Sequence, residues 1–349
     1  MTRPFKSSPC AAGVVLQRTV GLLQRAVPYL PMQMAALGLA SGVVFATAAT
    51  AHAQGAPWPT KTISMIVPYP PGGGSDALAR ALGQAMGERW GQSVIVENVA
   101  GADGIIGTQK VIRAPADGHT ILLQVNQMLL YKAAAPELKL MENLKLVSMI
   151  QHSPLSFAVA SSFPGNTMKD FIAYCKVNKC SWGSSTKYGT LIGKQLMDAA
   201  GLSDLVVHAP YKGTGPMMTD LLGGHITLGL PAVASGLPHF KSGKLKFLAV
   251  GSPERFSMVP HVQTLVEGGL QVYGNSWYGL MVHKDTLAPI FNAIVDAVKA
   301  ASKNQALLNI IESNAALPDF SDPVKFAEDV RKETLQMEAL MLKFPPDTN

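Results

Sequence analysis

Hydrophobic positions from about residue 60 onward follow two alternating patterns. Short runs rich in apolar and β-branched residues predict strands, and longer stretches with apolar residues three or four positions apart predict helices. The predicted strands are Ile63–Val67, Ser93–Glu97, Thr120–Val125, Ser156–Ala160, Ser181–Ser184, Val206–His208, Ile226–Leu230, Leu245–Val250 and Leu280–Val282. Helices are predicted between them and from Pro289 to the C-terminus. This alternation indicates an α/β fold with parallel sheets covered by helices on both faces.

The chain after residue 53 contains no Gly/Ser-rich linker, so separate lobes would have to be joined by strands that cross between them. The candidate crossings are Leu155–Ser161 and Ser276–His283. We therefore predict a discontinuous first lobe, residues 54–157 plus 279–349, and a second lobe, residues 158–278.

The first 53 residues differ from the rest of the chain. They hold four basic residues and no acidic one, and the uncharged stretch Met34–Ala51 leads into Ala51-His52-Ala53. This order predicts an export signal over residues 1–53 that is cleaved after Ala53, and hence a periplasmic protein. A membrane anchor is the alternative, and it is disfavoured because the stretch is rich in Ala, Gly and Thr and lacks a basic stop-transfer flank.

The formal charge of +6 also originates mainly in this segment. Of the 29 basic residues these four lie in the signal, which leaves 25 basic against 23 acidic residues. The remaining chain is nearly neutral and has no basic run or basic-aromatic stripe. A nucleic-acid partner is therefore not expected.

Two cysteines, Cys175 and Cys180, remain after removal of the signal. In an oxidising compartment their spacing permits a local disulfide between a helix end and a strand start, and two unlinked buried thiols are the alternative. A metal site would need further ligands, and no His is near.

The sharpest local feature is the turn Tyr69-Pro70-Pro71-Gly72-Gly73-Gly74-Ser75 between a strand and a helix. Its glycines let backbone N–H groups approach a ligand, and the helix start, with Ser75 as the expected cap, suits a carboxylate or phosphate. A tight turn without a ligand is the alternative. Three other loops lie at the ends of strands, where ligands bind in α/β lobes: Gly101–Gly107, Ser184–Thr190 and Tyr211–Pro216.

Patterns typical of catalysis are absent from the sequence. There is no G-x-S-x-G, H-E-x-x-H or P-loop motif, and the scattered histidines, among them His208, lack ligand-like spacing. Gly101–Gly107 is not the dinucleotide fingerprint. We expect no enzyme activity, no cofactor and no metal.

The segments VPYPPGGGSDALAR, VENVAGADGIIG, APADGHTILL and APYKGTGPMMTDLLGGHITL closely resemble the successive signatures of the Bug family, the extracytoplasmic receptors of tripartite tricarboxylate transporters. The similarity runs from about Trp58 to the C-terminus. It implies a type II periplasmic binding protein, in which two Rossmann-like α/β lobes are joined by two crossing strands and enclose a ligand cleft.

The resemblance also implies site residues. The proline-glycine loop and the Ser/Thr loop of the other lobe would hold a ligand carboxylate, and further residues would flank the cleft. These expected ligand-binding residues are Tyr69, Pro71, Gly72, Gly73, Gly74, Ser75, Gly101, Ala102, Asn126, Ser184, Ser185, Thr186, Gly189, Thr190, Tyr211, Lys212 and Trp277. The chain departs from the family pattern in having Asp103 in place of a Gly and Ile105 in place of an Asn.

By this resemblance the expected function is capture of a small carboxylate, a di- or tricarboxylate or an aromatic acid, by hinge closure. The receptor, expected to be a monomer, would deliver it to the membrane components of a tripartite tricarboxylate-type transporter. The alternatives are a sensor that feeds a two-component system and, less favoured, a secreted hydrolase or lyase that uses the same cleft.

Overall fold

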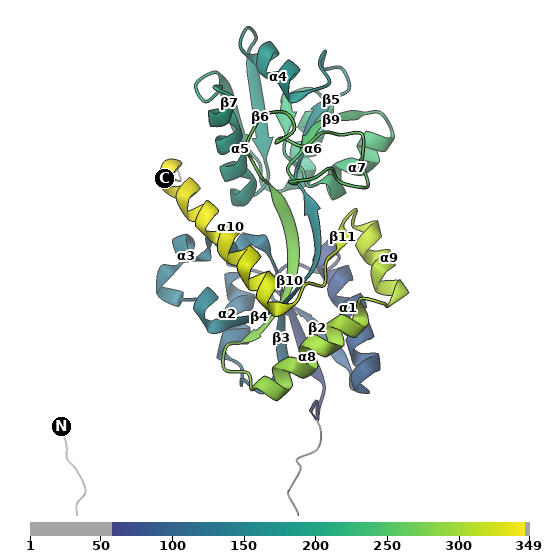
Figure 1. Ribbon diagram of the computed structural model, residues 1–349. Helices are drawn as coiled ribbons and strands as arrows, with labels where there is room; N and C mark the ends of the chain where they lie inside the picture. Colours follow the sequence, from purple (N-terminus) through teal and green to yellow (C-terminus); the bar gives the residue numbers. More distant parts are fainter. Residues whose placement is uncertain (1–57, 346–349) are drawn as a thin grey trace, which may run out of the picture. The chain divides into compact units, whose positions relative to one another are not determined.

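The computed structural model describes residues 58–345, and the expected export signal, its cleavage point and the stretch Met34–Ala51 lie outside these residues. Two mixed sheets form the framework (Figure 1). In order across the first sheet, the strands are β11 (Leu317–Pro318), β4 (Leu144–Pro154), β10 (Asn275–His283), β3 (Thr120–Val125), β1 (Ile63–Val67) and β2 (Val94–Asn98). The second sheet has the order β7 (Val206–Pro210), β6 (Cys180–Ser184), β8 (Leu228–Gly229), β5 (Ser156–Ala160) and β9 (Leu245–Val250). We call the parts built on them the first and the second lobe.

The parallel arrangement predicted from the strand–helix alternation is correct for only part of each sheet. β1 pairs with β2 and β3 in parallel, and β6 pairs in parallel with β7 and β8. The strands next to the lobe crossing, β4, β5 and β10, pair antiparallel because the chain passes through them in opposite directions. The sheets are therefore mixed.

Helices cover both faces of each sheet. Figure 1 shows α2, α3 and α10 on one side of the first sheet and α1, α8 and α9 on the other. In the second lobe α4 and α5 pack on one face and α6 and α7 on the other. The helices are α1 (Gly74–Trp90), α2 (Ile105–Arg113), α3 (Tyr131–Ala134), α4 (Met168–Cys175), α5 (Lys187–Ala199), α6 (Thr214–Leu222), α7 (Val233–Lys241), α8 (Ala288–Ala301), α9 (Gln305–Ser313) and α10 (Pro323–Lys343), with short 3-10 turns η1 (Ala102–Gly104), η2 (Asn126–Leu130), η3 (Pro136–Leu138) and η4 (Met141–Asn143).

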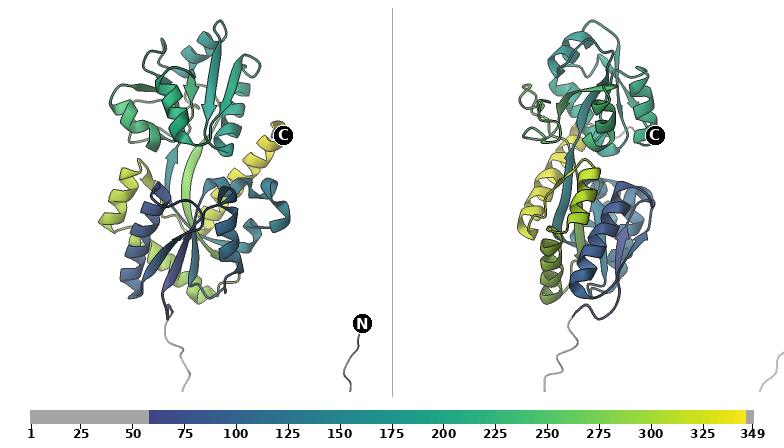
Figure 2. Two further views of the ribbon diagram at one scale, coloured as in Figure 1. Left: turned by 180° about the vertical axis from the view of Figure 1, so that it is seen from behind. Right: turned by 90° about the vertical axis from the view of Figure 1, so that its right-hand side faces the viewer.

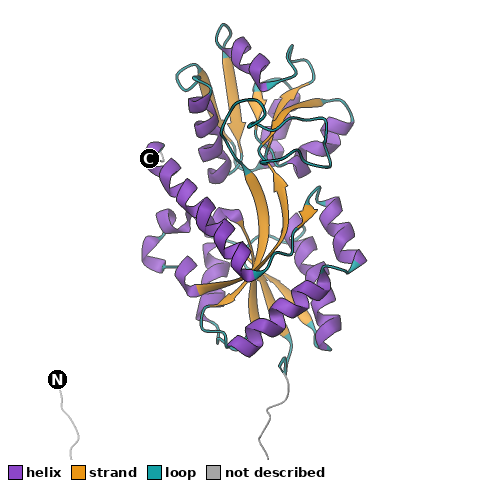
Figure 3. Cartoon of the chain, viewed as in Figure 1, coloured by secondary structure: helices purple, strands orange, loops and turns teal. Residues whose placement is uncertain are grey.

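Two crossings carry the chain between the lobes, one from β4 to β5 and one into β10, as Figure 3 and the two further views of Figure 2 make visible. β4 ends at Pro154 and β5 begins at Ser156, so the first crossing is at Leu155. The return crossing leads into β10 at Asn275, where Gly274 O accepts a hydrogen bond from Leu155 N at 2.9 Å. Sheet membership thus changes close to the predicted boundaries at 157 and 279, and the division into lobes at those two residues stays a prediction.

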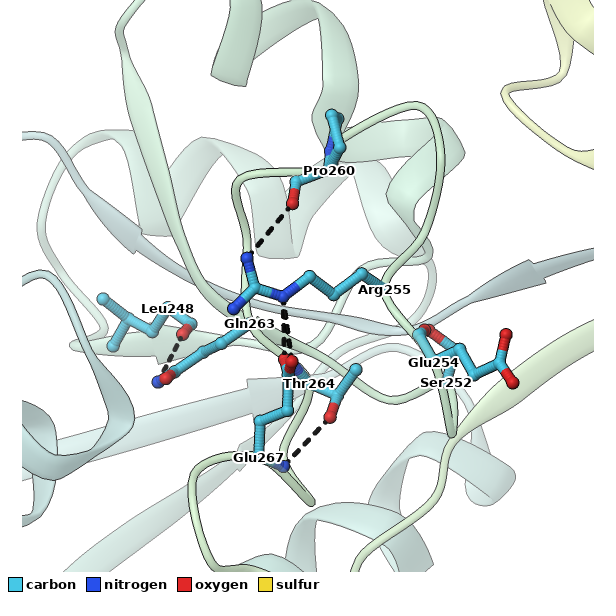
Figure 4. Close-up of polar contacts among 8 residues, drawn as sticks. All are labelled: Leu248, Ser252, Glu254, Arg255, Pro260, Gln263, Thr264 and Glu267. Atoms are coloured by element: carbon cyan, nitrogen blue, oxygen red, sulfur yellow. Dashed lines mark hydrogen bonds and ion pairs between the residues drawn. The ribbon is translucent and has the colours of Figure 1, made fainter.

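The connection from β9 to β10, residues 251–274, has no helix or strand and is held by its own polar contacts (Figure 4). Arg255 Nε donates to both carboxylate oxygens of Glu267 at 2.9 and 3.0 Å, and Arg255 Nη1 donates to Pro260 O at 3.3 Å. Thr264 and Glu267 cap each other's backbone N–H groups. These bonds give the return crossing a fixed approach to β10.

None of the helices over residues 58–345 is long and apolar enough to cross a membrane. The same residues contain a disulfide between Cys175, at the end of α4, and Cys180, the first residue of β6. Of the two alternatives that the sequence left open, the structure therefore has the local disulfide.

Candidate functional site

A cavity of about 590 Å³ lies where the two lobes meet. It is lined by Tyr69, Pro70, Pro71, Gly72, Gly73, Ser75, Val125, Asn126, Gln127, Leu155, Ser185, Thr186, Tyr188, Thr214, Leu230, Ala232, Ser235, Ser276 and Tyr278. None of these residues of the described chain carries a formal charge at neutral pH. Hydroxyl, amide and backbone groups therefore supply the polarity of the cavity.

A second hollow of about 670 Å³ runs along α1 and the edge strand β2. Its lining includes Gly83, Gly87 and Val94, and a Cβ on Gly83 would lie 3.1 Å from Val94 Cγ1, so these glycines serve close packing of helix on strand. No helix begins at this hollow. The interlobe cavity is the better candidate site because helix starts from both lobes converge on it.

The proline-glycine turn forms one wall of the cavity. It follows β1 directly and leads into α1, whose N-cap is Gly73, without a side-chain cap, so the expectation that Ser75 caps this helix is wrong. Ser75 lies inside the first turn instead. Gly72 has φ of +86°, which favours glycine, and its N–H donates to Asp76 Oδ2 at 3.1 Å.

Asp76 is turned toward its own loop. Its carboxylate accepts hydrogen bonds from Arg80 Nη2 at 3.0 Å and Nε at 3.2 Å. Burial works to raise the pKa of Asp76, but the hydrogen bonds from Arg80 and Gly72 outweigh it and lower the pKa below its usual value. This carboxylate is therefore compensated locally and does not repel an anion in the cavity.

The Ser/Thr loop of the second lobe forms the opposite wall. Ser185 and Thr186 line the cavity, and Thr186 Oγ1 also caps α5 by accepting a bond from Gly189 N at 2.9 Å. Ser185 Oγ is bonded at 3.1 Å to Thr214 Oγ1, the first residue of α6. The starts of α5 and α6 are thus held together at the same cavity.

Other predicted residues of this loop support it from behind. Ser184 is 1% exposed, and its hydroxyl contacts Thr190 Oγ1 at 2.7 Å and His208 Nε2 at 2.9 Å. A serine–histidine contact therefore exists that the sequence motifs gave no reason to expect. Ser184 does not line the cavity, so its hydroxyl is placed to brace the loop.

Four helices begin at the cavity, α1 from the first lobe and α5, α6 and α7 from the second. The start of α7 contributes its N-cap Ala232 and Ser235, which the sequence did not single out. Each helix start presents unpaired backbone N–H groups and a partial positive charge. Together they give the cavity, which has no charged side chains in its lining, a positive potential that favours a negatively charged group.

A buried hydrogen-bond chain supports the first-lobe wall. Tyr69 Oη donates to Gln124 Oε1 at 2.8 Å, and Gln124 Nε2 donates to Tyr131 Oη at 2.8 Å and to Thr108 Oγ1 at 3.0 Å. Tyr131 Oη in turn donates to Asp103 O at 3.1 Å. Burial raises the pKa of Tyr69 above its usual value and that of Tyr131 to about 12, so both phenols stay protonated donors.

A second set of bonds fixes the lobe crossing beside the cavity. Asn126 Nδ2 donates to Asn275 O at 2.8 Å, and Asn275 N donates to Tyr188 Oη at 3.2 Å. Tyr188 belongs to the second lobe, whereas Asn126 and Asn275 belong to the first. Ligand-lining residues of both lobes thus contact the first residue of β10.

The structure brings together eight of the predicted ligand-binding residues at one cavity: Tyr69, Pro71, Gly72, Gly73, Ser75, Asn126, Ser185 and Thr186. Gly74, Ser184, Gly189 and Thr190 are adjacent to the lining in their loops without being part of it. Gly101, Ala102, Tyr211 and Lys212 do not line the cavity either. Gly101 and Ala102 lie in the turn at η1, and Lys212 is exposed. Tyr211 Oη donates to Asp220 at 2.6 Å.

Trp277 is the clearest departure from the expected site. Its side chain is fully buried, packs edge-on against Phe326 at 5.4 Å and donates Nε1–H to Glu333 at 2.9 Å. Its neighbours Ser276 and Tyr278 line the cavity instead, because successive side chains on a strand point to opposite faces. The aromatic group that this segment contributes is Tyr278.

No cluster of three or more His, Cys, Asp or Glu residues that could hold a metal is found within residues 58–345. That observation concerns the described chain alone. The chemistry that the cavity itself offers is hydrogen bonding to a small polar ligand.

Comparisons with known proteins agree with this geometry. The family model described as "Tripartite tricarboxylate transporter family receptor" matches residues 78–340. Protein BugT of Bordetella pertussis is 32% identical over 303 residues, which cover 84% of this chain and 92% of BugT.

Solved structures give the same result. A TctC solute-binding protein from Polaromonas superimposes with a TM-score of 0.73 at 27% identity, covering 82% of this chain and 100% of that one. MatC from Rhodopseudomonas palustris, solved with bound malate, has a TM-score of 0.65 at 25% identity and coverages of 81% and 99%. The family match, together with two lobes that share one cavity, identifies the chain as a member of the tripartite tricarboxylate transporter receptor family, whose members are solute-binding receptors.

Proposed function

We propose that this receptor captures a small carboxylate in the periplasm by closing its two lobes over the interlobe cavity, and that it delivers the ligand to the membrane components of a tripartite-type transporter. The observation that carries the proposal is the convergence of four helix starts, from both lobes, on a cavity without charged side chains. A carboxylate is the ligand group that such N–H donors and partial charges favour. The malate bound to MatC supports the same ligand class.

The ligand would bridge the two walls. The oxygens of one carboxylate group would accept hydrogen bonds from N–H groups of the turn before α1. The other end of the ligand would contact the hydroxyls of Ser185 and Thr186. Tyr188 and Tyr278 offer apolar ring faces beside these donors. The mixture suits an acid whose body is at least partly apolar, aromatic acids included.

Closure follows from the division of the donors between the lobes. In an open arrangement each set of donors is hydrated, and a ligand held by one wall gains only part of the available bonds. A ligand stabilises the closed arrangement by its difference in affinity for the two states. The crossings at Leu155 and Asn275 are the places where backbone torsions would absorb such a movement.

The experiment is a thermal-shift screen of protein lacking residues 1–53 against mono-, di- and aromatic carboxylates, followed by calorimetry. A ligand at 100 times its Kd should stabilise the fold by about 2.7 kcal/mol. Ser185→Ala should weaken binding of the best acid by about 10- to 150-fold, since a hydrogen bond to a charged group contributes about 1.5–3 kcal/mol. The matched control is Ser161→Ala, an exposed serine of the same lobe away from the cavity.

Two results would contradict the proposal. One is a set of acids that leaves the melting temperature unchanged at every concentration. The other is equal affinity of the Ser185 and Ser161 variants. A sensor that feeds a two-component system would show the same ligand binding, and deletion of the gene would then abolish gene induction while leaving uptake intact.

A hydrolase is the second candidate because Ser184 Oγ lies 2.9 Å from His208 Nε2. This hydroxyl is 1% exposed and also engages Thr190, so a substrate in the cavity does not reach it without a rearrangement of the loop. Incubation of the best-binding acid, and of its esters, with protein should leave them unchanged. Turnover that disappears in Ser184→Ala would favour the enzyme instead.

A further inference from the structure

Two ion pairs among the described residues join the lobes: Lys343 with Asp198, between α10 and α5 at 2.6 Å, and Lys187 with Asp103, beside the cavity. Lys187 Nζ lies 3.2 Å from Asp103 Oδ2. Lys187 is the first residue of α5 in the second lobe, and Asp103 is the middle residue of η1 in the first lobe. The two residues are far apart in sequence and meet only through the approach of the lobes.

The pair is situated on the solvent side of the cavity. Thr186 and Tyr188, on either side of Lys187 in the chain, both line the cavity, whereas the side chains of Lys187 and Asp103 are 69% and 57% exposed. Burial raises the pKa of the cavity tyrosine Tyr69, and the negative charge of Asp103 adds to that shift. Asp103 is therefore near enough to the cavity wall to act on its groups.

Local preference does not explain Lys187. A lysine in the first turn of a helix opposes the helix dipole. Asp103 has φ of +54° and follows Ala102 at +46°, both in the left-handed region that favours glycine. Asp is among the few side chains that tolerate this conformation, so the turn can present a carboxylate toward Lys187.

The turn that carries Asp103 is also firmly placed. Tyr131 Oη donates to Asp103 O, and Tyr131 is bonded through Gln124 to the cavity residue Tyr69. A Cβ on Gly104 would lie 2.5 Å from Tyr131 Oη, so the backbone approaches this phenol closely. A rigid turn holds its carboxylate at a fixed point, which reduces the entropy lost when Lys187 binds it.

We infer that Asp103 and Lys187 form a latch that favours the arrangement of the lobes in this structure over more open arrangements before any ligand arrives. Its effect on ligand capture rests on the proposed function, since a larger closed fraction raises the apparent affinity of a ligand that binds that state. The latch itself does not depend on the ligand. As an exposed pair it should change the ratio of closed to open molecules by about 1.5- to 5-fold.

The test compares three proteins of equal formal charge, all without ligand. They are the wild type, the neutral double variant Asp103→Asn/Lys187→Gln, and the reversed double variant Asp103→Lys/Lys187→Asp. The net charge near the cavity is the same in all three. The wild type and the reversed variant have opposite charges at positions 103 and 187, and the neutral variant has none, so an effect of attraction should separate the neutral variant from the other two. The control is Glu328→Gln/Lys332→Gln, which removes an equally exposed pair within α10.

Small-angle scattering at about 20 mM and about 0.5 M NaCl supplies the readout, since salt screens exposed pairs. At low salt the neutral variant should be more expanded than the wild type, the reversed variant should match the wild type, and the control should not change. At high salt all should converge. An unchanged neutral variant, a reversed variant that behaves like the neutral one, or an expanded control would each overturn the latch.

Contact between the two side chains is tested separately by zero-length carbodiimide cross-linking and mass spectrometry. The latch requires a cross-linked peptide that joins Asp103 to Lys187 and whose yield falls at high salt. Absence of that peptide in ligand-free protein would overturn it. Neither measurement uses a ligand, so failure of the carboxylate proposal would show only in the binding screen and leave this result standing.

Discussion

Replacing Gln124 by leucine should weaken the fold at the cavity wall more than any apolar gain can offset. Gln124 is fully buried in β3 and uses both ends of its amide. Its Oε1 accepts bonds from Tyr69 Oη and from Val125 N, both at 2.8 Å. Its Nε2 donates to Tyr131 and Thr108.

The size of the effect follows from which partners lose their bonds. Thr108 still donates to Gly104 O and Tyr131 still donates to Asp103 O, so these hydroxyls keep a partner. Tyr69 Oη and Val125 N lose their acceptor. An unpaired buried polar group costs about 1–3 kcal/mol, so Gln124→Leu should lose roughly 2–6 kcal/mol before about 1 kcal/mol of apolar gain.

Thermal and urea unfolding of the variant measure this loss directly. The expected net loss of about 1–5 kcal/mol corresponds to a fall in melting temperature of roughly 2–8 °C for a chain of this size. The matched control is Gln84→Leu on α1, where an exposed amide donates only to Glu88 at 3.1 Å. Its stability should change by less than about 0.5 kcal/mol.

The reasoning would be refuted if Gln124→Leu were as stable as Gln84→Leu. That result would mean that water accepts the hydrogen bonds of Tyr69 Oη and Val125 N in the variant. The hydrogen-bond chain from Tyr69 to the Asp103 turn would then be accessible to solvent. A large loss of stability, with Tyr69 and Tyr131 in unchanged positions in a crystal structure of the variant, would support the hydrogen-bond chain through Gln124.

Three further predictions concern stability. Burial raises the pKa of Glu333 to about 7 from an ordinary value of 4.5, so the folded state holds this proton more tightly than the unfolded state does. The free energy of unfolding should therefore fall by up to about 3 kcal/mol as the pH rises from about 4.5 to 7. Urea titrations of Glu333→Gln should lack this fall. Replacement of Cys175 and Cys180 by serine opens a loop of five residues' separation and should cost about 2 kcal/mol in urea unfolding. Gly193→Ala should destabilise α5 by about 1–3 kcal/mol or more, measured by calorimetry, because its Cβ would lie 2.0 Å from the Trp182 ring.

Each of these predictions has a result that would contradict it. Identical pH profiles of wild type and Glu333→Gln would mean that Glu333 is hydrated in the folded state. An unchanged midpoint after reduction of the disulfide would mean that the α4–β6 loop is equally constrained without it. For the helix, Gly215→Ala in α6 is the control, because nothing lies within 4 Å of its Cβ, and it should be neutral or stabilising.

Local sequence patterns predicted much of the framework because the strands are short and apolar. Ile63–Val67, Thr120–Val125, Ser156–Ala160 and Leu245–Val250 have the predicted bounds. β4 was not predicted: Leu144–Pro154 mixes Lys, Ser, Gln and His with its apolar residues, and it is a strand because β10 and β11 pair with it from either side. Such support comes from residues far away in sequence, and a local pattern does not contain it.

The site shows the same division. The positions of loops at strand ends predicted that the proline-glycine turn and Ser185–Thr186 would lie at the cavity, because the topology of an α/β lobe fixes where strand ends meet. Trp277 was expected to flank the cleft, but Tyr278 lines the cavity instead. A crossing strand is buried on both faces, so its sequence does not reveal which face borders the cavity. The start of α7 was missed because Ala232 and Ser235 carry no chemical signal of their own.

A lining without charged side chains has a consequence for release as well as for capture. An arginine that held the carboxylate would bind it from one wall alone, and opening the lobes would leave that strong charge-assisted pair intact. Helix starts and hydroxyls each contribute little, and here they are divided between the two lobes, which we propose separate about the crossings at Leu155 and Asn275. In the proposed scheme, opening would separate the donors of one lobe from the ligand at once and let water take their place. An exposed pair such as Asp103–Lys187 fits this scheme, since it can bias closure without making the closed state too stable for a partner to open.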